Sequence, residues 1–413
     1  MRCRRGRCLV VAICATAGLM SVAVPALARS EPALSVRAAA LIDARTGQPL
    51  YTYAAHKELA IASTTKLMTA LLTLEHVRRL STVVAQNDYH SAAVDSQIGL
   101  VPGERMSVHD LLLALLLPSA DDAAEDLAYT VGHGSVSRFV AMMNVRAREL
   151  GLTETHYSTP IGLDTPGNYS SASDLVKLAR YALVHEPFFA RAVALPSATL
   201  LTGNSVRNVT NRNTLVGQVP WINGVKTGHT LDAGYVLVGS GTREGLTLIS
   251  AVLGTSSESS RDSNTLALLD YGFATFHVVE PVRAGEVVAR PSVRDQPGRH
   301  AIVLTARSFS TLIARKARVS VEVEVPAQLA GPLRAHTVVG TALVRADRRT
   351  LARVPLLLAH ALPAVSPLTI AARFVMRPFT LVPLVLLLAA AAGLMVRRRA
   401  RTRRSQVDGR EPA

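Results

Sequence analysis

The stretch Ile61-Ala62-Ser63-Thr64-Thr65-Lys66-Leu67-Met68-Thr69-Ala70 decides the fold of this chain. Ser63 and Lys66 stand three residues apart, so on a helix their side chains share one face and lie one turn apart. A hydroxyl beside an amine in this geometry is typical of a serine nucleophile with a lysine base. Both residue types are common, and by spacing alone Lys66 could equally be a solvated helix residue.

Composition favours a chemical role for Lys66. The chain has forty arginines but only five lysines, which are Lys57, Lys66, Lys177, Lys226 and Lys316. Lysine can lose its proton inside a protein whereas arginine cannot, so a retained lysine indicates a titrating group. The residues from Ser63 to about Arg78 are mostly apolar and predict a helix that is buried on most sides. Ser63 and Lys66 would then be polar groups entering a core, where such groups need partners.

The N-terminal segment predicts export. Residues 1–28 begin with four arginines, continue with an apolar run over 9–24 and end in Ala26-Leu27-Ala28, the pattern of a secretory signal peptide with its cleavage site. A retained anchor is the alternative. All three cysteines lie in this segment, at Cys3, Cys8 and Cys14. The mature chain is therefore expected to contain no disulfide, thiolate nucleophile or cysteine metal site.

The C-terminal segment predicts a membrane anchor. Residues 379–396 form an uncharged apolar run, just long enough for a helix to span a hydrocarbon core of about 30 Å. Six arginines follow between Arg397 and Arg404, and the positive-inside rule puts them in the cytoplasm. The sequence thus predicts a single-pass cell-membrane protein, with residues 29–378 on the cell-wall side and a basic cytoplasmic tail over 397–413. A buried helix followed by a nucleic-acid-binding tail is the alternative.

Much of the formal net charge of +15 belongs to these two ends. The signal segment contributes four arginines, and the tail contributes seven arginines against two acidic residues. The high charge therefore follows from membrane topology, and it gives no basis for nucleic-acid binding.

The order of the predicted elements indicates an α/β domain over residues 29–276. Two short strands are predicted within 38–53 and a block of helices between 63 and 184. Strands between 221 and 253 and a closing helix over 261–276 come next. Strands, then helices, then strands again predict an antiparallel sheet with a helical lobe inserted into it.

Residues 277–360 predict a second, all-β domain. Their apolar residues come in short, alternating, β-branched runs separated by Gly, Pro or polar turns, which is typical of a small sandwich. No residue pattern in this part indicates catalysis, so we expect it to be a spacer that holds the first domain away from the membrane. Residues 361–378 are expected to be a juxtamembrane linker.

Two further short motifs follow Ser63-x-x-Lys66 along the chain. They are Ser119-Ala120-Asp121 and Lys226-Thr227-Gly228. The three motifs in this order resemble the S-x-x-K, S-x-N and K-T-G set of low-molecular-weight penicillin-binding proteins, the serine-type D-alanyl-D-alanine carboxypeptidases of peptidase family S11. The resemblance covers about residues 30–276 and is carried further by the segments 112–119, 158–164, 211–213 and 223–235. It implies the α/β fold of penicillin-binding proteins and serine β-lactamases.

The resemblance also implies a mechanism. Ser63 would attack the carbonyl between the two terminal D-alanines of a peptidoglycan pentapeptide. Lys66, kept neutral by burial and by nearby Lys226, would take its proton, and Ser119 would relay a proton to the leaving D-alanine. The backbone N–H groups of Ser63 and His229 would form the oxyanion hole, and water would hydrolyse the acyl-enzyme. No metal or cofactor is needed, and β-lactams, which mimic acyl-D-Ala-D-Ala, are expected to inhibit by acylating Ser63.

The resemblance also implies that residues later in the chain bind the substrate. Lys226 and Thr227, assisted by Arg212, would hold the terminal carboxylate of the peptide. Gly228 would leave room for the peptide to lie against the strand as an added strand.

One position departs from the family pattern. The third residue of S-x-N is Asp121, where the family usually has Asn. Asn offers an N–H donor to the substrate's amide carbonyl, whereas an ionised Asp offers only acceptors. Asp121 could pair with Lys66 or Lys226 and weaken the base, or it could be protonated and donate. It could also be a plain helix cap beside Asp122.

Several functions therefore remain open. A membrane-anchored carboxypeptidase is the interpretation that the motifs favour. The membrane span and the carboxypeptidase-like flanks argue against a β-lactamase. A β-lactam-binding or wall-binding homologue that has weak or lost catalysis because of Asp121 is a second class. A structural membrane protein with chance motifs is a third.

Overall fold

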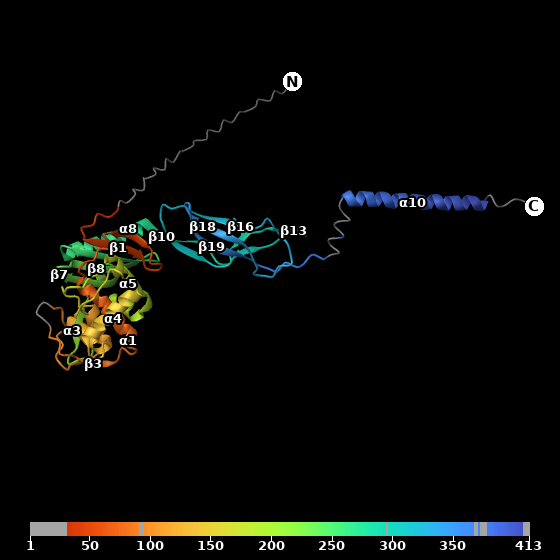
Figure 1. Cartoon of the computed structure of the whole chain (residues 1–413). Coiled ribbons are helices and arrows are strands. Elements are labelled where there is room, and N and C mark those ends of the chain that lie inside the picture. Colours follow the sequence, from red (N-terminus) through yellow and green to blue (C-terminus); the bar gives the residue numbers. More distant parts are fainter. Residues whose placement is uncertain (1–30, 91–94, 295, 367–370, 372–377, 408–413) are drawn as a thin grey trace, which may run out of the picture.

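The computed structural model describes residues 31–90, 95–294, 296–366, 371 and 378–407. An α/β part comes first, a β-rich part follows it, and a long helix lies near the C-terminus (Figure 1). The fold class predicted from the sequence is therefore confirmed. The predicted signal segment lies outside the described residues, as do most of the predicted linker and the end of the tail.

A five-stranded antiparallel sheet forms the centre of the first part. Its strand order is β2-β1-β9-β8-β7, so β7 lies at one edge. The strands are β1 Ala38–Asp43, β2 Pro49–Tyr53, β7 Ile222–Thr230, β8 Gly234–Arg243 and β9 Leu246–Thr255. The first two strands of the chain thus pair with its later strands, as the strand–helix–strand order predicts.

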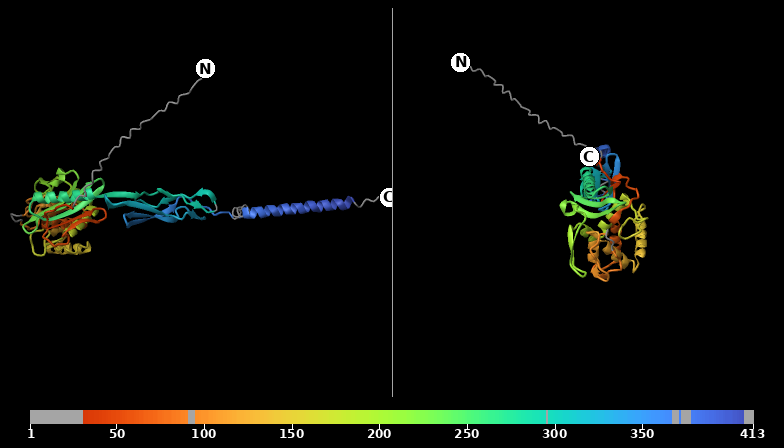
Figure 2. Two further views of the ribbon diagram at one scale, coloured as in Figure 1. Left: turned by 90° about the horizontal axis from the view of Figure 1, so that it is seen from above. Right: turned by 90° about the vertical axis from the view of Figure 1, so that its left-hand side faces the viewer.

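Helices cover both faces of this sheet (Figures 1 and 2). Alternate residues of β1 explain how, because Ala38 and Ala40 pack into the core of the helical lobe while Ala39 and Leu41 pack against α8. The helices are η1 Ala62–Thr65, α1 Lys66–His76, α2 Val108–Leu116, α3 Asp121–Val131, α4 Val136–Glu149, α5 Ala172–His185, α6 Pro187–Val193, the short α7 Leu215–Gln218 and α8 Glu258–Thr275.

Helix α1 is the centre of the helical lobe. Every residue from Lys66 to Thr73 is buried, which confirms the prediction of a helix surrounded by core. The α-helix begins at Lys66, however, and not at Ser63. The residues before it form the 3-10 turn η1, whose first residue, Ala62, has a left-handed φ of 49°. Ser63 therefore lies in a tight turn at the entrance of the helix.

Some small elements were not predicted. Helix α6 has only seven residues, too few to show a helical period in the sequence. Two hairpins also belong to the lobe, β3 Val83–Ala85 with β4 Arg105–Ser107, and β5 Ser197–Leu200 with β6 Arg207–Thr210.

The β-rich part continues directly from α8 and extends away from the helical lobe (Figures 1 and 2). It contains a five-stranded sheet, β11-β14-β19-β18-β16, a three-stranded sheet, β13-β12-β17, and the pair β10-β15. Its strands are β10 Phe276–Val282, β11 Val287–Ala289, β12 Ser292–Val293, β13 Gln296–His300, β14 Val303–Thr305, β15 Phe309–Ala314, β16 Val319–Glu324, β17 Gln328–Leu329, β18 Val338–Ala346 and β19 Arg349–Leu358. Residues from all three sheets, such as Val282, Val293 and Val354, share one hydrophobic core. The all-β character is confirmed.

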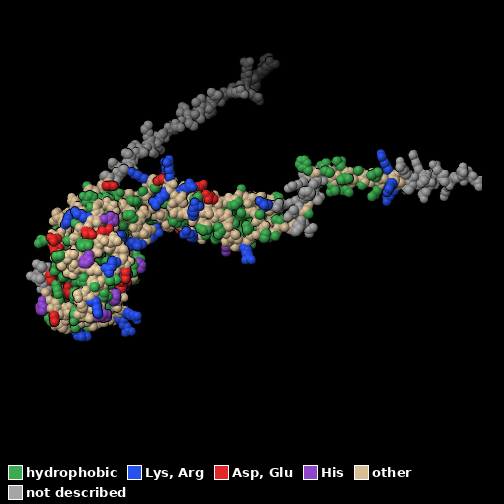
Figure 3. Space-filling view, viewed as in Figure 1, with side chains coloured by type: hydrophobic (Ala, Val, Ile, Leu, Met, Phe, Trp, Pro, Cys, Tyr) green, Lys and Arg blue, Asp and Glu red, His purple; other side chains and the backbone are tan. Residues whose placement is uncertain are grey.

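Helix α10, Pro378–Val407, contains one apolar stretch, Leu381–Ala400, that is long enough to cross a membrane. None of this stretch is buried against the rest of the chain. Hydrophobic side chains cover most of this helix, and Lys or Arg side chains appear toward its C-terminal end (Figure 3). A single candidate span in the described residues is compatible with the predicted anchor.

Candidate active site

The serine and lysine of the first motif are in contact. Lys66 Nζ lies 3.0 Å from Ser63 Oγ, which is a hydrogen-bond distance. The 3-10 turn causes this approach, because residues three apart eclipse each other in that geometry. The pairing that the spacing suggested is therefore present, although the two residues belong to adjacent elements.

Lys66 is fully buried and has two further partners. Its Nζ donates to the carbonyl oxygen of Ile161 at 2.8 Å and pairs with Asp121 Oδ1 at 2.5 Å. The Ile161 carbonyl is fixed by the packing of Gly162, where a Cβ would overlap the Ala62 carbonyl oxygen. One amine thus links η1, the 158–164 loop and the start of α3. The solvated-residue alternative for Lys66 is wrong.

Burial and charge act in opposite directions on the lysine. Burial lowers the pKa of Lys66, the carboxylate of Asp121 raises it again, and the positive charge of Arg212 lowers it further. The net direction is a lowered pKa. Burial also raises the pKa of Asp121, against the effect of Lys66. Both members of the pair are therefore displaced toward their neutral forms.

Ser119 lies in a strained turn between α2 and α3. Its φ is 71°, in the left-handed region that non-glycine residues seldom adopt. The side chain is buried, and among the described residues its hydroxyl has no hydrogen-bond partner. A buried hydroxyl without a partner costs free energy, so its position suits a group that acts on a bound ligand.

Edge strand β7 packs against the turn that carries Ser63. A Cβ on Gly228 would lie 3.0 Å from the backbone nitrogen of Ser63 and 3.0 Å from the carbonyl oxygen of Ile61. A glycine is therefore needed for the two backbones to approach this closely. Among the described strands, β8 alone pairs with β7, so the other edge of β7 can accept an added strand.

The remaining predicted residues line up along β7 and beside it. Lys226 is buried, and burial together with the charges of Lys66 and Arg212 lowers its pKa well below the usual value. Thr227 is buried as well, whereas His229 is exposed and stacks on Tyr235 with ring centroids 4.0 Å apart. Arg212 is exposed, and its backbone nitrogen donates to the carbonyl oxygen of Leu117 at the end of α2. Two segments therefore supply cations whose charges interact with the Ser63–Lys66 pair, Lys226 from β7 and Arg212 from the loop before α7.

Asp121 is fixed from its other side by a loop that was not singled out in the sequence. The backbone nitrogen of Ser96 donates to Asp121 Oδ2 at 3.1 Å, and the backbone nitrogen of Asp121 donates to the Ser96 carbonyl oxygen at 2.6 Å. Asp122 holds the same loop by accepting from the nitrogens of Ile98 and Leu100, both at 3.1 Å. The helix-cap alternative is therefore incomplete, because Asp121 joins the loop to Lys66.

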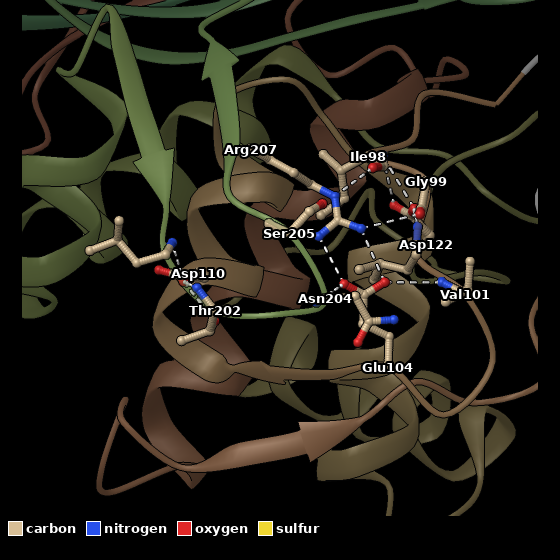
Figure 4. A network of polar contacts seen from close by, with 12 residues as sticks. Ile98, Gly99, Val101, Glu104, Asp110, Asp122, Thr202, Asn204, Ser205 and Arg207 are labelled. Atoms are coloured by element: carbon tan, nitrogen blue, oxygen red, sulfur yellow. Dashed lines mark hydrogen bonds and ion pairs between the residues drawn. The ribbon is translucent and has the colours of Figure 1, made fainter.

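A polar network anchors this loop to the β5–β6 hairpin (Figure 4). Arg207 donates to both oxygens of Glu104, at 2.8 and 3.0 Å, and to the carbonyl oxygen of Ile98 at 3.0 Å. Burial alone would raise the pKa of Glu104, but Arg207 and backbone N–H groups lower it, so the pair is ionic. Asp110 fixes the hairpin by accepting from the backbone of Leu201 and Thr202. The three motifs do not mark this network, since its members are spread over 98–207.

The described residues contain no group of three His, Cys, Asp or Glu side chains arranged to hold a metal ion. The chemistry available at the site is that of a hydroxyl, an amine, a carboxylate and backbone N–H groups, which suits acyl transfer through a serine ester.

Comparison with known proteins agrees with this geometry. Residues 26–257 match the family model of the D-alanyl-D-alanine carboxypeptidases, peptidase S11. The chain belongs to this family. It is a serine D-alanyl-D-alanine carboxypeptidase by family, as the three motifs predicted.

Two curated relatives of this S11 peptidase differ in how much of the chain they match. The carboxypeptidase DacF of Bacillus subtilis is 30% identical over 344 residues, which is 79% of this chain and 85% of the relative. The carboxypeptidase DacB2 of Mycobacterium tuberculosis is 38% identical over 218 residues, covering 52% of this chain and 74% of its own length.

Solved structures show the same fold. Penicillin-binding protein 5 of Haemophilus influenzae superimposes with a TM-score of 0.63 at 26% identity, covering 81% of this S11 peptidase and 99% of that structure. The DD-transpeptidase of Streptomyces K15 superimposes with a TM-score of 0.56 at 35% identity, covering 59% of this chain and 99% of its own. The match to penicillin-binding protein 5 covers 81% of this chain, which is more than the α/β part alone makes up. The similarity therefore extends into the β-rich part.

Proposed function

We propose that this S11 peptidase removes the terminal D-alanine from peptidoglycan stem peptides through an acyl-enzyme on Ser63. The observation that carries the proposal is the 3.0 Å contact between Ser63 Oγ and a fully buried Lys66 amine. In this mechanism the Ser63 oxygen bonds to the carbonyl carbon while its proton moves to Lys66. The Ser119 hydroxyl passes a proton to the nitrogen of the departing D-alanine, and water then cleaves the ester.

We assign substrate binding to β7 and its neighbours. The backbone N–H groups of Ser63 and His229 would stabilise the oxyanion, since Gly228, next to His229, lies against the Ser63 nitrogen. Lys226 and Thr227 would hold the terminal carboxylate of the peptide together with Arg212. β-Lactams would acylate Ser63 as analogues of the same acyl group.

We further propose that α10 anchors the enzyme in the cell membrane, with the two folded parts on the cell-wall side and the C-terminus in the cytoplasm. The support is its exposed apolar stretch, Leu381–Ala400, followed by the arginine-rich end of the chain. The β-rich part would then act as the spacer, and residues 1–28 as the signal peptide.

The contact between Asp121 and Lys66 favours one alternative. A carboxylate 2.5 Å from the amine opposes loss of its proton, and in this alternative catalysis is weak while penicillin still binds. This second function is a penicillin-binding homologue with little turnover.

The deciding experiment measures D-alanine release from a diacylated Lys-D-Ala-D-Ala peptide, together with fluorescent-penicillin labelling, by the full chain in detergent. We expect wild type to do both and Ser63→Ala to do neither. Labelling at Ser63 without D-alanine release would favour the penicillin-binding homologue. Unchanged release by Ser63→Ala would overturn the site assignment.

A further inference from the structure

The two folded parts of this chain carry net charges of opposite sign. Residues 31–276 contain eighteen Lys or Arg and twenty-two Asp or Glu, whereas residues 277–360 contain thirteen Lys or Arg and six Asp or Glu. An excess of one sign repels itself and disfavours a compact fold. The proposed mechanism takes place in the α/β part and does not use the positive charge of the β-rich part.

Four arginines of the β-rich part lie near the end from which the chain continues to α10. They are Arg290, Arg294, Arg299 and Arg334. The sheet β13-β12-β17 forms this end, on the side of the β-rich part that is farther from the α/β part (Figure 1). Leu333, next to Arg334, pairs with Leu362, after which the chain leaves for α10.

Backbone contacts bring the other three arginines to the same sheet. Arg294 follows β12, and its backbone nitrogen donates to the carbonyl oxygen of Leu329 in β17 at 2.7 Å. Arg299 lies on β13, which pairs with β12. The ring of His300 donates to the carbonyl oxygen of Arg290 at 3.1 Å. Arginines that are up to 44 positions apart in the sequence thus belong to one end of the fold.

This end has a local excess of positive charge. All four arginines are exposed, and none forms an ion pair with another residue that the structure describes. In the sequence, Asp295 is the single acidic residue within 287–300 and 327–337. At the opposite end of the β-rich part, by contrast, Arg315 pairs with Glu244 of the α/β part at 3.5 Å. The four arginines therefore have no evident role inside the molecule.

A polar cavity of about 300 Å³ lies at the same end. Its polar lining side chains are a hydroxyl, two amides, a guanidinium and an imidazole, from Ser292, Gln296, Gln328, Arg299 and His300. No carboxylate is among its lining residues. Guanidinium groups bind phosphate oxygens through paired N–H donors, and hydroxyl and amide groups can add further donors. The cavity therefore suits the phosphate of a lipid headgroup.

We propose that this end of the β-rich part docks on anionic phospholipid headgroups at the surface of the membrane that holds α10. The inference rests on the proposed anchor. Residues 363–377 separate Leu362 from α10, and fifteen residues reach at most about 50 Å. This tether gives the lipid surface a high effective concentration, which an untethered anionic wall polymer lacks. The attraction of a few arginines to a charged surface is weak by itself, so the tether makes it effective.

Docking would orient the enzyme. Strand β18 alone has nine residues and so extends over about 30 Å. The α/β part is attached at the far end of the β-rich part (Figure 2). Attraction to a charged surface falls off within about 8 Å at physiological salt, so only the arginine-rich end would hold to the lipid. The active site would then be held away from the membrane, toward the wall.

The opposite end of the β-rich part supplies a matched control. Arg318, Arg348 and Arg349 are exposed there, in two neighbouring turns joined by the hydrogen bond from the Asp347 nitrogen to the Arg318 carbonyl oxygen. The turn before β16 also contacts the end of α8, because the Arg315 nitrogen donates to the Thr275 carbonyl oxygen at 2.8 Å. Replacing these three arginines removes the same charge from the end that would face away from the lipid.

The test measures how close this end lies to lipid in the full chain. A donor fluorophore is placed at the exposed position next to Arg334 through Ala335→Cys, after the three natural cysteines within residues 1–28 have been replaced by Ser. The chain is reconstituted in nanodiscs that contain an acceptor-labelled lipid. One set of discs is phosphatidylcholine, and the other also contains phosphatidylglycerol.

Energy transfer should be about twofold higher in the discs with phosphatidylglycerol. The difference should disappear in 1 M salt, where the Debye length is about 3 Å. It should also disappear in Arg294→Gln/Arg299→Gln/Arg334→Gln. The control Arg318→Gln/Arg348→Gln/Arg349→Gln should keep it, and both triple variants should keep the thermal unfolding midpoint.

Equal transfer in the two lipids for wild type, or equal loss in both triple variants, would overturn the inference. Binding of soluble poly(glycerol phosphate) without any response to phosphatidylglycerol would overturn it in favour of an anionic wall polymer. A chain that stays out of the discs would instead overturn the proposed anchor. Sedimentation of the same variants with phosphatidylglycerol vesicles would then decide whether the three arginines bind lipid.

Discussion

At the scale of the residue, the unusual feature of this enzyme is the carboxylate next to its lysine. Burial disfavours the charged forms of both Lys66 and Asp121, while their contact at 2.5 Å favours them. Asp121 also joins the lysine to the 96–104 loop through Ser96. Asp121 therefore has two effects. Its charge raises the pKa of Lys66, which opposes its action as a base, and its hydrogen bond to Ser96 holds the neighbouring loop in place.

Asp121→Asn should make Lys66 a more effective base. Asn keeps the acceptor for Ser96 N but removes the negative charge, so the pKa of Lys66 falls and more of the amine is neutral at pH 7. Each unit by which this pKa falls raises the neutral fraction about tenfold, so we expect acylation by penicillin to be about tenfold faster. The rising limb of the pH–rate profile should also move to lower pH. A slower variant with an unchanged thermal unfolding midpoint would contradict this account and assign Asp121 a direct role.

At the scale of the element, the site depends on how closely edge strand β7 approaches the turn η1. The approach is possible because position 228 has no side chain. The turn is shaped in addition by the left-handed backbone at Ala62 and by Gly162 packed against it. Three separate segments therefore determine the distance between the nucleophile and the substrate-binding strand.

Gly228→Ala should impair catalysis more than stability. The new methyl group would push β7 and η1 apart by a few tenths of an ångström or more, and small misplacements of reacting groups can lower rates by about 100-fold. We expect kcat/KM for D-alanine release to fall by about that factor. The comparison variant is Gly245→Ala, where the open β8–β9 turn leaves free space but φ is +76°.

The two variants separate the loss of close packing at position 228 from the backbone strain that alanine causes at position 245. Gly245→Ala should cost about 1 kcal/mol of folding free energy through backbone strain and leave the rate unchanged. Equal losses of rate in the two variants would show that the proximity of β7 to Ser63 is not what limits catalysis.

At the scale of the whole molecule, catalysis and attachment belong to different parts of the chain. The predicted site lies in the α/β part, the β-rich part has its own hydrophobic core, and α10 presents its apolar stretch to the surroundings. Within the part of the chain that the structure describes, no hydrogen bond or ion pair of Lys66 or Ser63 involves a residue beyond β9. Removal of the helix should therefore change where the enzyme is found without changing what it does.

A chain that ends at residue 366 should move from the membrane fraction to the soluble fraction. Sites this far apart act independently, so the acylation rate by fluorescent penicillin should stay within about twofold of wild type. Fractionation and labelling of the same samples measure both properties. A truncated chain that remains in the membrane fraction would show that α10 is not the principal anchor.

The sequence by itself determined the fold class, the family and most of the candidate site. Three short motifs are local, and each needs only its own residues to be recognised. The scarcity of lysine indicated that Lys66 titrates, and apolar runs located the central helix and α10, since burial and membrane insertion both leave local patterns. The start of α1 was misplaced by three residues, because a 3-10 turn and the first turn of an α-helix have nearly the same sequence preferences.

Only the tertiary structure decided which partner Asp121 has and which residues surround Lys66. Ile161 and Ser96 reach the site through chain packing, and no local pattern shows that one accepts from Lys66 and the other donates to Asp121. Whether a buried carboxylate pairs with Lys66 or with Lys226 depends on a few ångströms of backbone placement, which a one-dimensional pattern does not contain. The pKa of a buried group is the sum of burial and of charges from several segments, so the working state of the lysine is a property of the assembled fold.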